Sequence, residues 1–100
     1  MILQIDTKDQ KVITVSLKKN GKVVESLSKE NEYGSQVLLP LIIKLLRTTN
    51  YELRTLQAIE VETGPGSFTG IRVGVSVANA LGFSLEIPVN GKKIETKLIY

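Results

Sequence analysis

The sequence of 100 residues contains no cysteine, no histidine and no tryptophan. Without cysteine there is no disulfide and no thiol nucleophile, and without histidine there is no Ser-His or Cys-His catalysis. The usual zinc and haem ligands are missing as well. Only carboxylates, hydroxyls, lysines and backbone groups remain for chemistry. We therefore expect no catalytic residue, no metal site and no cofactor held by this chain alone.

Long apolar segments and a strong charge bias are also lacking. No apolar run approaches the roughly 20 residues that span a bilayer, and the start MILQIDTKD lacks the basic start and the small-residue cleavage site of a secretory signal. These absences predict a cytoplasmic protein with no membrane partner. The net charge is only +3. The lysines that gather near the N-terminus have no aromatic residues between them and predict a solvated face rather than a nucleic-acid site: Lys8, Lys11, Lys18, Lys19 and Lys22.

The first thirty residues alternate in hydrophobicity as strands do. Residues 2–6 (ILQID) predict a buried strand, and residues 11–18 (KVITVSLK) predict a strand with one buried face. Asn20-Gly21 supplies the positive φ angles of a tight hairpin turn. Residues 22–28 then return antiparallel, which completes a three-stranded meander.

Two helices and two further strands are predicted after the meander. Residues 36–47 form a leucine-rich helix with Ser35 as its N-cap and a bend or early tight turn at Pro40. A strand over 57–63, a helix over 69–83 and a short strand over 87–89 complete the elements. Residues 90–100 could form a strand or a loose tail.

The element order β-β-β-α-β-α-β predicts an α/β fold with a five-stranded mixed sheet, in which the first, fourth and fifth strands are parallel. This arrangement resembles one half-domain of the ribonuclease H-like group, which is repeated in the actin and Hsp70 ATPases. We expect a single domain over residues 1–100.

The loop GPGSFTG at 64–70 joins a strand to a helix, as phosphate-binding loops do. It lacks the lysine of a Walker A loop, and Thr69 stands where a dinucleotide fingerprint needs its third glycine. Two interpretations stay open: a structural turn that fixes the entry of the helix, or an anion site on exposed amides. The anion candidates are Asp6, Thr7, Gly64, Gly66, Ser67 and Thr69.

Three carboxylates lie on strands that should be neighbours. Asp6 ends the first strand, and Glu60 and Glu62 lie on the fourth. Carboxylates in such places hold magnesium ions in ribonuclease H-like nucleases. The leucine-rich helix offers no further acid, so we favour the alternative that Asp6 hydrogen-bonds the turn Thr7-Lys8-Asp9.

The two helices carry more apolar surface than one sheet face should cover. On the second helix, small residues recur at Gly70, Gly74, Ala78 and Gly82, and such a ridge lets another backbone approach closely. The stripe of Val73, Val77 and Leu81, with Ile71 and Val75, would then cover the sheet. We expect a protein partner on the ridge, although the two helices could instead pack only on each other. The predicted interface consists of Leu38, Leu39, Ile42, Leu46, Gly70, Arg72, Gly74, Val77 and Ala78.

Three segments resemble the N-terminal domain of the TsaB (YeaZ-like) family: ILQIDT, SQVLLPLI and AIEVETGPGSFTGIRVGVSVANAL. The resemblance covers about residues 1–90. It implies a non-catalytic subunit in the synthesis of N6-threonylcarbamoyladenosine at position 37 of tRNA. It also implies that the helices bind the transferase TsaD, or a second copy when the chain is alone. The ATPase TsaE would join in the full assembly, ATP or ADP would bind only there, and contact with tRNA would be weak or indirect.

This chain departs from the family pattern in three places. Family members usually carry a second domain after the position of Val89, which puts an inter-domain nucleotide cleft in doubt. Gly34 stands where a histidine or arginine is common, and Asn79 stands where a lysine is frequent. Two other functions stay open beside the scaffold: a homodimeric structural protein and a small nucleotide-binding remnant of the ATPase superfamily.

Overall fold

The computed structural model describes residues 1–9, 11–30, 35–66 and 68–92, without the side chains of residues 35, 36 and 68. The elements, in chain order, are β1 (Ile2–Asp6), β2 (Val12–Lys19), β3 (Lys22–Glu30), α1 (Ser35–Thr49), a short 3-10 helix (Leu53–Thr55), β4 (Ala58–Val61) and α2 (Phe68–Leu85). None of these described helices is both long enough and apolar enough to cross a bilayer.

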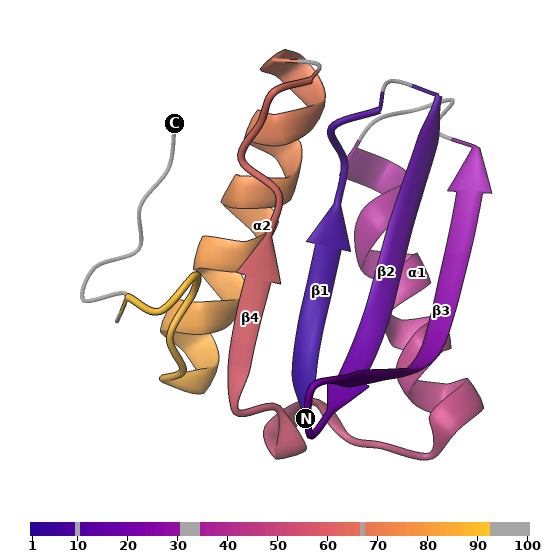
Figure 1. Cartoon of the computed structure of the whole chain (residues 1–100), viewed down its shortest axis with the longest axis vertical. Coiled ribbons are helices and arrows are strands. Elements are labelled where there is room, and N and C mark those ends of the chain that lie inside the picture. Colours follow the sequence, from indigo (N-terminus) through magenta and orange to yellow (C-terminus); the bar gives the residue numbers. More distant parts are fainter. Residues whose placement is uncertain (10, 31–34, 67, 93–100) are drawn as a thin grey trace.

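The described strands form one mixed sheet in the order β3-β2-β1-β4 (Figure 1). β1 pairs antiparallel with β2 and parallel with β4, as predicted. The predicted hairpin turn is confirmed, with φ angles of 54° at Asn20 and 80° at Gly21. Both predicted helices are present, and α1 continues through Pro40 without a break. The N-cap role predicted for Ser35 lies outside the described side chains.

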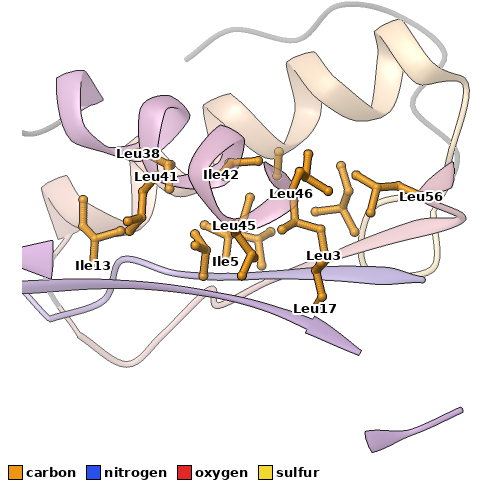
Figure 2. Packing of buried hydrophobic residues seen from close by; sticks show 14 of the residues in the cluster. Leu3, Ile5, Ile13, Leu17, Leu38, Leu41, Ile42, Leu45, Leu46 and Leu56 are labelled. Carbon is orange, nitrogen blue, oxygen red and sulfur yellow. The ribbon is translucent and has the colours of Figure 1, made fainter. Parts of the chain in front are cut away.

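Both helices lie on the same face of the sheet, with α1 over β2 and β3 and α2 over β1 and β4 (Figures 1 and 2). Alternation along each strand sends the apolar side chains toward the helices. Figure 2 shows the α1 side chains that meet them. The fully buried core residues of the strands and of α1 are Leu3, Ile5, Ile13, Val15, Leu17, Ile59, Leu38, Ile42 and Leu45.

The prediction of a fifth strand is wrong, because the described sheet has four. At the predicted strand, Val89 makes only an isolated parallel bridge to Ile59. The side chain of Asn90 then replaces the next strand residue: its Oδ1 accepts from the Val61 N–H at 2.8 Å, and its Nδ2 donates to the Val61 carbonyl at 3.0 Å. Asn90 and Gly91 both have positive φ, so the chain turns away there. Residues 93–100, which include most of the predicted tail, lie outside the described residues.

The side of α2 that meets the sheet agrees only in part with the prediction, because the predicted stripe packs on the core as partly buried residues while the small residues lie deeper. Gly70, Gly74 and Ala78 are buried, and a Cβ on Gly74 would meet Thr7 of the turn after β1 and Val61 of β4. Val73 and Val77 are only half-buried. The small residues therefore let α2 approach its own sheet, because at Gly74 a larger residue would clash with the side chains of Thr7 and Val61.

Candidate functional site

The C-terminal end of β1 is tied directly to the start of α2. Thr7 is fully buried, and its hydroxyl donates to the carbonyl oxygen of Gly70 at 2.5 Å. Asp6 accepts a hydrogen bond from the Lys8 N–H through Oδ1 at 3.2 Å, which confirms the predicted contact between Asp6 and its turn. These bonds hold the β1 turn against α2.

The GPGSFTG loop packs on the same turn. A Cβ on Gly66 would lie 2.6 Å from the Cβ and 2.8 Å from the carbonyl oxygen of Lys8, so only glycine fits this approach. Gly64 has a φ of 131°, a conformation that side chains rarely adopt. The loop thus packs on a residue 58 positions earlier in the sequence (66 − 8), which favours the structural interpretation.

The five anion candidates that the structure describes lie at one end of the sheet but are not equally available. The Thr7 hydroxyl is buried and bonded within the chain, whereas Thr69 is exposed on the first turn of α2. Ser67 lies outside the described residues. At this junction the buried Thr7 hydroxyl is already hydrogen-bonded to Gly70 of the same chain.

The three carboxylates lie on the face of the sheet that the helices leave uncovered. A cavity of about 220 Å³ on this open face is lined mostly by polar residues: Gln4, Ile5, Asp6, Thr14, Ser16, Glu60, Val61 and Glu62. Glu60 accepts from Gln4 Nε2 at 2.8 Å and pairs with Lys18 Nζ at 3.4 Å. Among the described residues, no three acidic groups lie close enough together to hold a metal ion.

The apolar face of α1 is divided between the core and solvent. Leu38, Ile42 and Leu46 were predicted at a partner interface, and this prediction is wrong because all three are buried in the core. Leu39 remains 43% exposed, and Ile43, one turn further, is 40% exposed. An outward-facing apolar pair is therefore present on α1, but its second member was not predicted.

The predicted interface residues of α2 divide in the same way. Gly70, Gly74 and Ala78 contact the chain's own sheet and are not available to a partner. Arg72 is exposed and Val77 is half-buried. Asn79, which stands at the family's lysine position, is only 6% exposed. Gly34 lies outside the described residues.

The prediction missed two kinds of residue. Asn90 was assigned to a tail, although an Asn-Gly pair directly after a short apolar segment is a hairpin signal that could have indicated a turn at the sheet edge. Val23 and Val24, 56% and 50% exposed on β3, were counted only as strand residues. Their exposure depends on β3 being an edge strand, which its own sequence does not reveal.

Comparisons with known proteins agree with this geometry. A family model described as "TsaD: tRNA N6-adenosine threonylcarbamoyltransferase" matches residues 10–91. The chain is 37% identical over 92 residues to the tRNA threonylcarbamoyladenosine biosynthesis protein TsaB of Buchnera aphidicola, covering 91% of this chain and 43% of that protein. It is 42% identical over 71 residues to a tRNA N6-adenosine threonylcarbamoyltransferase of Nitrosospira multiformis, covering 71% of this chain and 20% of that protein.

A solved structure shows the same arrangement of elements. YeaZ from Pseudomonas aeruginosa matches with a TM-score of 0.79 and 32% identity, covering 88% of this chain and 41% of that one. The chain spans less than half the length of the relatives it matches. By the matched family model and these similarities, the chain belongs to the TsaD family of tRNA N6-adenosine threonylcarbamoyltransferases, as a TsaB/YeaZ-like member.

Proposed function

We propose that the chain acts in the synthesis of N6-threonylcarbamoyladenosine on tRNA as a non-catalytic partner subunit that binds a TsaD-like transferase. The functions for which its relatives are named support a role in this pathway. The observation that carries the subunit role is that apolar side chains of the helix layer stay exposed on α1 and only half-buried on α2. We call these side chains the helix surface and define it as Leu39, Ile43, Val73 and Val77.

The helix surface has the composition of a protein interface. α1 and α2 contact each other, and Leu39 and Ile43 lie on the flank of α1 away from β3, because the residues that face β3 are Val37, Pro40, Leu41 and Lys44. Apolar side chains gathered on one side of a small domain are typical of binding surfaces.

The proposal extends to the remaining members of the assembly. A TsaE-like ATPase would join the pair, ATP or ADP would bind at the assembly, and tRNA would contact this chain weakly or indirectly, in the cytoplasm. We also assign the fold to the ribonuclease H-like group of the actin and Hsp70 ATPases, as one half-domain. The antiparallel β1-β2-β3 meander and the parallel β1-β4 pair support this assignment.

Association with the transferase tests the proposal. The chain is mixed with the TsaD-like protein of the same organism, and the mass of the mixture is measured by light scattering. We expect a complex that Ile43→Asp weakens at least about tenfold, because the substitution buries a charge in the interface. Val23→Asp is the matched control, since it places the same charge on an exposed valine of β3.

Two results would contradict the proposal. The first is a mixture that contains only the separate masses at high concentration. The second is a complex that Ile43→Asp and Val23→Asp weaken equally, which would mean that the helix surface is not the contact. Gly74→Leu is unsuitable as a test of this surface because Gly74 packs on Thr7 and Val61.

A further inference from the structure

β3 is an edge strand with one open side. Among the described residues it pairs only with β2. Its register with β2 shifts at Val24, which leaves Glu25–Glu30 as its regular part. The N–H of Ser26 bonds the exposed carboxylate of Glu25 at 3.0 Å, which indicates that this N–H points out of the sheet edge. A sheet edge with no strand on its outer side is a template for another strand, which would replace this local bond of the Ser26 N–H.

We propose that two copies of the chain associate through β3, antiparallel and about a two-fold axis at Leu27. In this register Ser26 lies opposite Ser28 of the second copy, and Glu25 lies opposite Lys29. Each pair occurs twice, as a symmetric contact requires. Paired positions differ by an even number, so backbone groups that point outward meet others that also point outward. The two four-stranded sheets would become one continuous sheet with all helices on one face.

The charge pattern selects this register over its neighbours. Moving the axis to Ser28 would set Lys29 opposite Leu27, and moving it between Leu27 and Ser28 would set Glu25 opposite Glu30. An axis at Ser26 would draw the irregular Val24 into the pairing. Only the axis at Leu27 places opposite charges together within the regular part of β3, and such cross-strand pairs are favourable whereas like charges are not.

Both faces of β3 suit a second copy. On the open face, hydroxyls already bridge β2 and β3, from Ser16 Oγ to Ser26 Oγ at 2.8 Å and from Thr14 Oγ1 to Ser28 Oγ at 2.9 Å, and the new Ser26–Ser28 pairs would continue this row. On the helix side, a groove of about 430 Å³ separates β3 from α1, lined by Leu27, Ser28, Lys29, Val37, Pro40, Leu41 and Lys44. The second copy would cover its apolar wall.

The proposed contact is separate from the helix surface. Leu39 and Ile43 lie on the opposite flank of α1 from the groove. A copy bound along β3 would therefore leave the helix surface open to the transferase. The proposal goes beyond the partner role, and either can fail without the other.

Charge reversal tests the register. Sedimentation across a wide concentration range should show that the unmodified chain dimerises. Glu25→Lys and Lys29→Glu should each weaken the dimer at least about tenfold, because each creates two like-charged pairs. An equimolar mixture of these two variants should form a heterodimer, since every cross-strand pair is then opposite in charge. The doubly reversed chain should dimerise like the unmodified one.

Two controls separate the register from general effects on folding. Circular dichroism should show that each variant is folded, and Lys22→Glu, on the same strand but outside the pairing, should leave the dimer unchanged. The proposal is overturned if the unmodified chain stays monomeric at millimolar concentration. It is also overturned if the single reversals leave the dimer intact, or if their mixture forms no heterodimer.

Discussion

At Gly74 even a single methyl group would clash with the neighbouring side chains. A Cβ there would approach the Thr7 hydroxyl oxygen well inside 3.0 Å and lie 3.3 Å from Cγ2 of Val61. The Thr7 hydroxyl cannot move aside freely, because it donates to Gly70. Gly74, which was predicted at a partner interface, therefore packs against the chain's own β1 turn.

We expect Gly74→Ala to lower the free energy of unfolding by about 1–3 kcal/mol, the usual cost of overpacking. The same change in an exposed helix interior raises stability by about 1 kcal/mol, so the sign of the effect is diagnostic. Urea unfolding followed by circular dichroism measures it. In a Thr7→Ala background the cost should fall by about 1 kcal/mol or more, because the two positions are in contact. Equal costs in both backgrounds would show that Thr7 is not the obstacle.

The edge of β4 is completed by a side chain rather than by a strand. Asn90 makes two hydrogen bonds with the backbone of Val61, and Val89 adds a single bridge to Ile59. The other Asn-Gly turn, at Asn20-Gly21, has similar φ angles. Asn20 is exposed, and its side chain makes no hydrogen bond like those of Asn90 within the described part of the chain. The two turns form a natural pair for comparison.

We expect Asn90→Asp to lower the free energy of unfolding by about 1–3 kcal/mol, because a carboxylate cannot donate to the Val61 carbonyl. Asn20→Asp should change it by less than about 0.5 kcal/mol, as at an ordinary surface site. Thermal unfolding of the two variants side by side provides the comparison. A loss of similar size at both turns would mean that backbone conformation, not the amide bonds, sets the cost.

The strands and helices could be predicted from the sequence because their signals are local. The alternation of Ile13, Val15 and Leu17 and the Asn20-Gly21 turn each specify their element within a few residues. Whether residues 87–89 pair as a strand depends on Asn90 and Val61, which lie 29 positions apart. The orientation of α2 likewise depends on Thr7, a residue 63 positions from Gly70. Contacts of this range leave no local pattern.

The candidate site was predicted in outline only. Periodicity correctly indicated that α1 has apolar residues around most of its circumference, but not which of them reach solvent. Leu38 and Leu39 are adjacent leucines, yet the first is buried and the second is 43% exposed. Neighbouring residues of a helix point about 100° apart, so the difference depends on which side of α1 faces the sheet, and that side is set by the packing of both layers.

At the scale of the whole domain, nucleotide binding by the isolated chain can be tested directly. Gly66 of the GPGSFTG loop packs on Lys8, and the hydroxyl of Thr7 is buried and bonded to Gly70. We expect titration of the isolated chain with ADP or ATP to produce no binding heat in calorimetry. Saturable heat that Thr69→Ala abolishes would contradict this expectation, because Thr69 is the one candidate hydroxyl that the structure describes as exposed.

The small residues of α2 also constrain how the protein can change over generations. Three small residues of α2 are buried where the helix packs on the sheet: Gly70, Gly74 and Ala78. Larger side chains there would damage folding before they affected the binding of another protein. Substitutions that retune the choice of partner must therefore accumulate on the solvent side of the two helices and along β3. Substitutions on these surfaces can change the choice of partner without changing the fold.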